Sequence, residues 1–284
     1  MDIVMCVALK ECFFLRKNIL FIRKNINPTH IWIITNKRNF KYLPKENDIT
    51  LIDEDKLIDG LTFQKVKSII DNHLHVKNYG WYFQQFLKLG FALSSYAKEE
   101  YLVWDSDTVP FNKLNFKKGE SDLFLPKTEH NAPYFETIDK LFEAPIKANY
   151  SFISEHMIFR CSILKEMLNK IEGKHMNKKP WYELCITSVK PYTKNGFSEY
   201  ETYGTYCINY HPQLLCPRTL RTFRRCSKLY SIFASSKEIQ TLAEDLDTGS
   251  FEVYDYPVGG FRKYKQIIYN YFCKIVTKKR MIMN

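Results

Sequence analysis

The chain has 284 residues, is 45% hydrophobic and carries a formal net charge of +11 at pH 7. This length fits one large α/β domain, alone or with a small extension, and the apolar content is enough to bury a sizeable core. No apolar run is long enough to cross a bilayer, which argues against a membrane-spanning protein. The positive charge suits an anionic partner such as a nucleotide, a nucleic acid or an anionic membrane surface.

Cysteine spacing and the N-terminus indicate where the protein works. The eight cysteines include no Cys-x-x-Cys pair and match no zinc-binding spacing. They are expected to be reduced thiols that behave as small apolar residues. The N-terminal apolar run carries Asp2 and ends at Lys10, which is too soon for a signal peptide. We therefore predict a cytoplasmic protein, with any membrane contact peripheral and at the inner face.

Strands and helices alternate in the first part of the chain. Short apolar runs predict buried strands over 3–9, 30–35 and 49–52, and helical patterns predict helices over 12–26 and 62–73. A strand, a helix and a second strand in this order indicate a right-handed βαβ unit and a parallel sheet. The predicted fold class is α/β, with a central, mostly parallel sheet flanked by helices.

The next predicted helix, over 80–97, carries polar side chains on one face. Trp81, Gln84, Gln85 and Lys88 share that face on a 3.6-residue period. The face is either a solvated stripe or one wall of a ligand cleft, with Lys88 near a phosphate. The helix leads directly into another strand, and ligands of parallel α/β sheets bind at the carboxyl ends of the strands.

That strand ends in two carboxylates, in the stretch Tyr101–Pro110 (YLVWDSDTVP). Carboxylates at the end of a buried strand need solvent, a partner or a metal. At alternate positions of an extended chain, Asp105 and Asp107 would point to the same side. They would then form a hard-oxygen site suited to Mg²⁺ or Mn²⁺, with open positions for phosphate oxygens. The alternative is a strand end with two turn-forming aspartates.

Another carboxylate lies in a strand-like segment over 150–159. Glu155 has apolar neighbours there, so it is either a satisfied buried group or a functional one. Around this segment the patterns predict a strand over 122–126 and helices over 134–143 and 162–171.

A further helix is predicted to begin after Ser198, which forms a capping box with Glu201. Glu199 then lies in the first helical turn, where the helix dipole would lower its pKa. An ionised carboxylate at that point could accept a proton or bind sugar hydroxyls. His211 follows the helix and is either a structural residue or a third metal ligand.

The end of the chain is strongly basic. Residues 218–284 hold 13 Lys and Arg against 6 Asp and Glu, and 235–252 is expected to be the loosest segment. A helical stripe of apolar residues is flanked by basic ones: Phe261, Tyr264, Ile268, Tyr271 and Ile275 beside Arg262, Lys263, Lys265, Lys274, Lys278, Lys279 and Arg280. Such a helix either lies on an anionic membrane or docks on the domain with its basic face in solvent.

Taken in order, these stretches resemble bacterial GT-A glycosyltransferases of the surface-polysaccharide and lipopolysaccharide type. The resemblance rests on the GWYFQQFLKL helix, the strand ending in VWDSDTVP, the ISEHMIF strand and the SEYETYG helix. It covers residues 1–215 and implies one GT-A (Rossmann-like) catalytic domain. Residues 216–284 would be a basic helical extension that contacts a membrane or the acceptor.

The resemblance also implies a substrate set: a nucleotide-sugar donor, with a UDP-sugar favoured, and a surface-glycan or lipid-linked acceptor. It implies Mn²⁺ or Mg²⁺ held by the Asp-x-Asp motif. Asp107 would bind the metal and Asp105 the metal or the donor, and His211 resembles the late metal-ligating histidine of some members. Lys10, Gln85 and Lys88 would line the donor site.

The base of an inverting mechanism would be Glu199 by the same resemblance. Members of the family often have two adjacent acids there, whereas here Tyr200 separates Glu199 from Glu201. Glu155 is therefore the alternative base, and a retaining mechanism would not need a base at this position.

Two other functions are compatible with parts of the sequence. A nucleotidyltransferase shares the nucleotide-binding sheet, but it usually has a glycine-rich loop after its first strand, and Ala8–Cys12 contains no glycine. A nucleic-acid-binding protein would interleave basic and aromatic side chains over a groove. Here the basic residues concentrate in the tail, so no nucleic-acid partner is expected.

Overall fold

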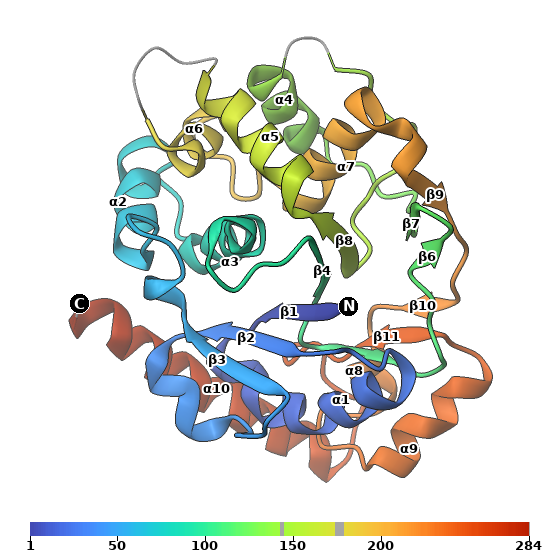
Figure 1. The fold of residues 1–284 in the computed structure, drawn as a ribbon. Helices are drawn as coiled ribbons and strands as arrows, with labels where there is room; N and C mark the ends of the chain where they lie inside the picture. Colours follow the sequence, from blue (N-terminus) through green and yellow to red (C-terminus); the bar gives the residue numbers. More distant parts are fainter. Residues whose placement is uncertain (143–144, 174–178, 284) are drawn as a thin grey trace.

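A five-stranded sheet forms the centre of the chain in a computed structural model that describes residues 1–142, 145–173 and 179–283 (Figure 1). Its strands are β1 (Asp2–Cys6), β2 (Ile31–Thr35), β3 (Ile49–Asp53), β4 (Glu100–Trp104) and β8 (His156–Arg160), in the order β3-β2-β1-β4-β8. The first four are parallel and β8 runs antiparallel to β4. The predicted α/β fold with a mostly parallel sheet is confirmed.

Helices cover both faces of this sheet (Figure 1). Below it in Figure 1 lies α1 (Cys12–Asn25), and above it lie α2 (Phe63–His73), α3 (Tyr79–Gly90), α5 (Cys161–Gly173), α6 (Trp181–Ser188) and α7 (Glu199–Tyr210). Successive residues of each strand point to opposite faces of the sheet, because the strand is pleated. In β1, Ile3 and Met5 join the core under α1, whereas Val4 and Cys6 join the core under α3.

The strand order places a ligand crevice at the end of β1. From β1 the chain passes to β2 and β3 on one side, and β4 lies on the other side. At such a switch point the loops after neighbouring strands diverge and leave a crevice at their carboxyl ends. The loop after β1 contains the 3-10 turn η1 (Leu9–Glu11), and the chain after β4 contains Asp105.

Residues beyond 215 form small sheets with earlier parts of the chain. The strand β9 (Leu215–Pro217) pairs with β7 (Ser121–Phe124), which also pairs with β6 (Lys117–Lys118). The strand β11 (Thr248–Ser250) pairs with β5 (Thr108–Pro110) and with β10 (Thr222–Phe223). A third hydrophobic core joins Phe14 and Phe111 to Phe251. The division of the chain at 215 stays a prediction.

Several predicted elements need correction. The segment 235–252 is not loose, because it contains α9 (Ser236–Thr241) and the paired strand β11. The strand predicted over 150–159 starts only at His156, because Glu155 has a left-handed backbone (φ 63°) that an extended strand cannot contain. Strand 122–126 belongs to a small sheet outside the central one.

Two helices also differ from their prediction. The helix predicted over 80–97 ends at Gly90 and continues as the 3-10 turn η4 (Phe91–Leu93). The helix predicted over 134–143 is α4 (Ala132–Leu141), and residue 143 lies outside the described residues. Helix α6 and the short α8 (Cys226–Leu229) were not predicted.

The C-terminal helix α10 (Phe261–Met283) turns its apolar stripe outward. Phe261, Tyr264, Ile268 and Tyr271 are 82%, 64%, 69% and 67% exposed. The helix docks through Gln266, Asn270 and Cys273, which are buried. The apolar stripe is therefore not the docking face. No helix within the described residues is long and apolar enough to cross a membrane, and the side chains of Lys279 and Arg280 lie outside that part.

Candidate functional site

A cleft of ≈ 1110 Å³ opens at the carboxyl ends of β1 and β4. Its floor is built by the loop after β1, the residue after β4, the polar face of α3 and the start of α7. The residues contributed by these elements are Ala8, Lys10, Glu11, Trp81, Gln84, Gln85, Lys88, Asp105, Glu199 and Tyr200. The four polar-face residues of α3 all line the cleft, and Gln85 and Lys88 are buried, so this face is not a fully solvated stripe.

Lys88 is the centre of the site. Its Nζ lies 2.6 Å from Asp105 Oδ1 and 2.7 Å from Glu199 Oε1, and its side chain is 3% exposed. Nζ also lies 3.4 Å from the hydroxyl of Tyr200 and 4.7 Å from the centre of that ring. Burial opposes the charge on Lys88, but Asp105 and Glu199 outweigh it and hold the lysine pKa well above its usual value. Lys88 is thus a fixed buried cation that ties together three segments distant in sequence.

Glu199 begins helix α7 and is 4% exposed. Its backbone N–H donates to Gln85 Oε1 at 3.1 Å, so α3 fixes the start of α7. Burial raises the pKa of the Glu199 carboxyl, with Lys88 acting in the opposite direction. The expected lowering of this pKa by the helix dipole is therefore wrong, because desolvation outweighs the dipole and the lysine.

Gln85 uses both ends of its amide inside the protein. Oε1 accepts from Glu199 and Nε2 donates to the carbonyl of Trp81 at 3.2 Å. It is 3% exposed. These two hydrogen bonds indicate that Gln85 positions Glu199 beside Lys88. The role of Gln85 in donor binding stays a prediction.

Asp105 and Asp107 flank a turn rather than lying on one strand. Strand β4 ends at Trp104, and the N–H of Thr108 donates to the carbonyl of Asp105 at 3.0 Å. The expected alternation along an extended strand is therefore wrong. The two carboxylates still influence each other. Burial, followed by the negative charges of Glu11 and Asp105, holds the pKa of Asp107 well above its usual value.

Glu11 supports this turn from the loop after β1. Its Oε2 accepts from the N–H of Ala8 at 2.9 Å and from the hydroxyl of Ser106 at 2.8 Å. Lys10 lies 3.4 Å from Glu11 Oε1 and 5.2 Å from the ring centre of Tyr254. The predicted donor residue Lys10 thus lies on the cleft wall beside the Asp105–Asp107 turn.

Glu155 lies beside the cleft rather than among its lining residues. Its Oε1 is 2.9 Å from Arg224 Nε and its Oε2 is 3.8 Å from Lys127 Nζ. Its carbonyl accepts from the N–H of Asp105 at 2.9 Å. Burial raises the pKa of Glu155 to about 6, although the two cations oppose that shift. Its left-handed backbone is a strained conformation of the kind that collects near functional sites.

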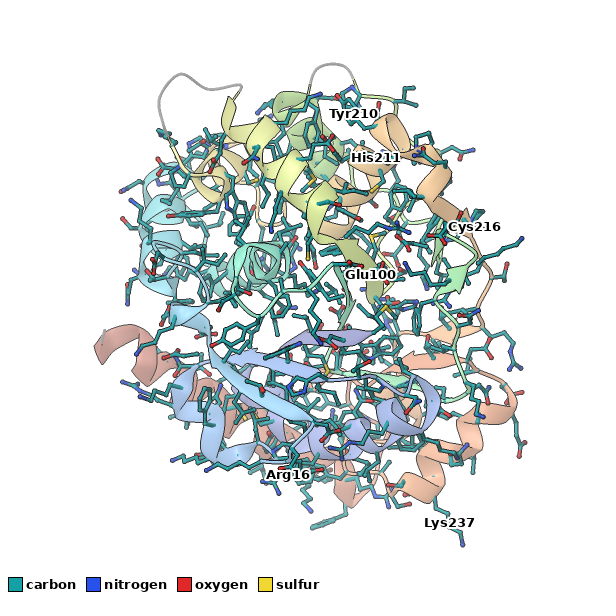
Figure 2. All side chains as sticks on the ribbon, in the orientation of Figure 1. Arg16, Glu100, Tyr210, His211, Cys216 and Lys237 are labelled. Atoms are coloured by element: carbon teal, nitrogen blue, oxygen red, sulfur yellow. The ribbon has the colours of Figure 1, made fainter. Side chains whose placement is uncertain are left out.

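His211 lies apart from the carboxylates. It caps the end of α7, 12 residues after Glu199, which corresponds to about 18 Å along the helix axis. Figure 2 shows Tyr210 and His211 together at that end of α7. His211 Nε2 lies 3.1 Å from Glu166 Oε2. The structure therefore brings together Lys88, Asp105 and Glu199, but not His211.

A smaller cavity of ≈ 180 Å³ adjoins the cleft at the ends of β1 and β2. The two share Ala8, Gly80 and Gln84 in their linings. The walls of the smaller cavity are mostly apolar, with a few polar groups at its edge, which is the usual composition of a small-molecule pocket. They include Ile34, Phe83, Leu87, Val276, Asn36, Arg38 and Asn39. Helix α10 thus reaches this cavity through Val276.

A divalent cation fits the Asp105–Asp107 turn only with help from a ligand. Across residues 1–142, 145–173 and 179–283, no group of three or more His, Cys, Asp or Glu is arranged to hold a metal. Asp105 and Asp107 supply two carboxylates, and the pKa of Asp107 is raised by burial first and then by the negative charges of Glu11 and Asp105. Mg²⁺ is commonly held by one or two carboxylates together with substrate phosphates and water. Because Asp105 Oδ1 accepts from Lys88 at 2.6 Å and from the Tyr200 hydroxyl at 3.2 Å, a cation here would be held by the second oxygen of Asp105 and by Asp107.

Glu201 is a second buried carboxylate of α7, and it is not among the residues that line the cleft. Ser198 Oγ accepts from the N–H of Glu201 at 3.3 Å, which confirms half of the predicted capping box. The Glu201 side chain instead accepts from Ser151 Oγ and, at 3.1 Å, from the N–H of Phe152. Its Oε2 has no hydrogen-bond partner among the described residues. Burial raises its pKa from 4.5 to about 7.

We expect Glu201→Gln to stabilise the protein at pH 8 by about 3 kcal/mol, at ~1.4 kcal/mol for each pKa unit. The folded protein holds this proton more tightly than the unfolded chain does. The stability that the protonated Glu201 carboxyl gives to the folded state is therefore complete below pH 4.5, and it is lost as the pH rises through about 7. Urea unfolding of both proteins at pH 5 and pH 8 measures the difference. The exposed Glu136→Gln is the control, and equal pH dependence of wild type and Glu201→Gln would contradict the expectation.

Sequence reasoning missed several residues of the site. Glu11, Tyr200 and Arg224 were not selected, although they join the site through Ser106, Lys88 and Glu155. Tyr200 could have been found from its position between two acids at a helix start. Glu11 and Arg224 carry no local signal, because only the fold brings them near the turn and Glu155.

Comparisons with known proteins give matches in structure alone. No family model matches the sequence, and no curated protein matches it. Two similar solved structures are the galactosyltransferase LgtC in complex with donor and acceptor sugar analogs and an active-site mutant of LgtC. They have 10% identity and TM-scores of 0.43 and 0.42, with 96% and 95% of this chain and 95% of each of those chains covered. Mouse xyloside xylosyltransferase 1 in its apo form has 11% identity and a TM-score of 0.46, over 91% of this chain and 100% of its own.

Proposed function

We propose that this chain is a metal-dependent glycosyltransferase of the GT-A type. It would move a sugar from a nucleotide-sugar donor, with a UDP-sugar favoured, to a surface-glycan or lipid-linked acceptor. The observation that carries the proposal is the cleft at the carboxyl ends of β1 and β4, where Asp105 contacts buried Lys88, Lys88 contacts Glu199, and Asp107 follows Asp105 in a turn. Paired carboxylates next to a fixed cation suit a ligand that carries both phosphate and a cation.

The two adjoining cavities suit the two ends of such a donor. The smaller one has the apolar walls and amide groups that a nucleobase needs, with Asn36, Asn39 and Phe83 in its lining. The diphosphate would then cross Ala8 and Gln84, which the two cavities share, toward Lys10. The transferred sugar would lie near Glu199.

Asp105 and Asp107 would hold Mn²⁺ or Mg²⁺ together with the diphosphate. When bound, the cation would offset the charge that develops on the departing nucleoside diphosphate. Lys10 on the cleft wall would add positive charge beside it. Glu11 would hold the turn in place through Ser106.

Glu199 is the proposed base, and Glu155 the alternative. Glu199 lines the cleft, and a carboxylate with a raised pKa accepts a proton better than an ordinary one does near neutral pH. Lys88 would keep Glu199 ionised until the acceptor hydroxyl gives up its proton. Glu155 has a raised pKa as well, but its carboxylate is engaged by Arg224 and it is not among the residues that line the cleft.

Donor consumption without an acceptor tests the proposed function. Purified protein with Mn²⁺ and a panel of UDP-, GDP-, CMP- and dTDP-sugars should slowly release the free nucleotide from one of them. We expect Glu199→Gln to reduce that release by about 10²–10⁴-fold, the usual contribution of a general base. Glu166→Gln, beside the far end of α7, is the matched control and should keep the wild-type rate. Failure to consume any sugar of the panel would contradict the proposal.

The exposed face of α10 suits an anionic membrane, where a lipid-linked acceptor would be found. Its stripe, which includes Ile268 and Tyr271, is flanked by the basic residues Lys263, Lys265 and Lys274. Apolar contact and charge together give such helices their affinity for anionic lipid.

Co-sedimentation with phosphatidylglycerol vesicles tests this contact, and pure phosphatidylcholine vesicles are the neutral comparison. Ile268→Asp should weaken sedimentation with the anionic vesicles. Leu20→Asp, at another exposed apolar site on α1, should not. Equal sedimentation with both vesicle types, or none, would rule the contact out.

A further inference from the structure

Two aromatic rings lie in the large cleft without taking part in the ion network. Trp81 comes from α3 and Tyr134 from α4, and both line the cleft. Their ring centres are 6.2 Å apart and their planes differ by 16°, so they form an offset stack. Tyr134 is 8% exposed, which fixes its ring against the protein. The pair gives the cleft one flat, apolar wall.

This wall lies close to the proposed base. Trp81 is seven residues before Lys88 on the same face of α3, about 10 Å away along the helix axis. Gln85, between them, hydrogen-bonds both Trp81 and Glu199. The pKa of Tyr134 is raised by burial and, in part, by the charge of Glu199, which places its hydroxyl within electrostatic reach of that carboxylate.

Polar groups surround the aromatic pair. The side chains of Asn78 and Asn195 are hydrogen-bonded to each other at 2.7 Å at the cleft rim, where Asn131 joins them. Trp81 is itself half-buried, and the ring of Tyr82 meets its ring at 4.9 Å in a T-shaped contact. Amide groups beside a stacked aromatic pair suit a ligand that is apolar on one side and hydroxylated at its edge.

A pyranose ring has this character. Its axial C–H groups form an apolar face that packs on an aromatic ring through C–H contacts, and its hydroxyls point outward around the edge. The amide groups of Asn78, Asn131 and Asn195 can both donate and accept, as hydroxyls require. A nucleobase would also stack, but the donor path through Ala8 and Gln84 leads to the smaller cavity rather than to Trp81.

We propose that Trp81 and Tyr134 form the binding subsite for the acceptor, which is a pyranoside whose ring stacks on Trp81 with a hydroxyl directed toward Glu199. This inference rests on the proposed function and names the substrate class of the acceptor side of the cleft. It assigns the α3–α4 side to the acceptor and the β1–β2 side to the donor.

Fluorine NMR of protein labelled with 5-fluorotryptophan tests the subsite. The four tryptophans give separate signals, and the loss of one in Trp81→Phe identifies Trp81. The probes are methyl pyranosides of glucose, galactose, mannose and N-acetylglucosamine, added with UDP and Mn²⁺. We expect at least one to shift the Trp81 signal, while the signals of Trp104 and Trp181, which are buried in the core, stay in place.

Saturation-transfer NMR on the same pyranoside compares variants. Trp81→Ala should weaken its binding by about tenfold or more, and Trp81→Phe should restore most of it, because a stacked aromatic ring contributes about that factor. Tyr96→Ala removes a half-exposed ring outside the cleft and is the matched control, with binding expected to be unchanged.

The outcomes separate this inference from the proposed function. If UDP with Mn²⁺ binds the wild type and no pyranoside perturbs Trp81, the subsite is overturned and the donor site stands. The subsite is overturned as well if the pyranoside binds equally tightly to wild type and Trp81→Ala. If neither nucleotides nor pyranosides bind the folded wild type, both proposals fail.

Discussion

Replacing Lys88 with methionine should lower the free energy of unfolding by about 3–5 kcal/mol and weaken nucleotide binding, because Asp105 loses the cation that holds it in place. Methionine is unbranched like lysine and one heavy atom shorter, and the substitution removes the cation between Asp105 and Glu199. Breaking a buried ion pair from one side leaves uncompensated charge in a desolvated place, and this costs much more than the pair itself contributes. Urea denaturation and nucleotide titration of the variant measure the two effects.

The matched control is Lys147→Met. Lys147 pairs with Asp139 at 2.6 Å, but both side chains are more than a third exposed, so its loss should cost less than about 1 kcal/mol. The double variant Lys88→Met/Glu199→Gln should regain part of the stability, because one of the two stranded carboxylates is then neutral. If Lys88→Met is as stable as Lys147→Met, the claim that the ion pairs of Lys88 with Asp105 and Glu199 stabilise the site is wrong.

Gly204→Ala should lower the free energy of unfolding by about 1–2 kcal/mol, although alanine is the better helix former. Gly204 lies in the middle of α7, and a Cβ there would be 2.2–2.5 Å from ring atoms of Phe152. Phe152 is fully buried and its ring is held by Phe124 and Tyr150, so it has little room to move. The overpacking costs about 1–3 kcal/mol or more, whereas the helix propensity of alanine returns only about 1 kcal/mol.

Gly80→Ala is the matched glycine control. It lies in α3 with open space around its Cβ, so the same change should stabilise the fold by up to about 1 kcal/mol. Thermal unfolding of both variants measures the contrast. If Gly204→Ala is as stable as Gly80→Ala, the close contact between α7 and Phe152 is wrong.

Periodicity and motif order were enough to predict the central architecture. The alternation of apolar runs and helical patterns predicted β1, β2, β3 and α1 in the right order, because a buried parallel strand and an amphipathic helix have different periods. The polar face of α3 and the carboxylates after β4 were also predicted to be neighbours, from the rule that ligands bind at the carboxyl ends of parallel strands. Loops at the carboxyl ends of parallel strands meet regardless of their sequence separation.

The connections between distant segments could not be predicted in this way. Nothing near Lys88 in the sequence shows that its charge is taken up by Glu199, 111 residues later. The balance between desolvation and dipole at Glu199 also depends on how deeply the tertiary fold buries it. The pairing of β5 with β11 is another such case, because three-residue strands are specified by their partners and carry no pattern of their own.

The proposed function depends above all on nucleotide binding through a divalent cation at Asp105 and Asp107. Thermal unfolding with UDP, GDP, CMP and dTDP, with and without Mn²⁺, measures this binding in wild type, Asp107→Asn and the surface control Asp139→Asn. A ligand at 100 times its Kd stabilises the folded state by about 2.7 kcal/mol. We expect one nucleotide to raise the midpoint only when Mn²⁺ is present, in wild type and Asp139→Asn but not in Asp107→Asn. A shift that is independent of Mn²⁺ and of Asp107, or no shift with any nucleotide, would contradict this binding mode.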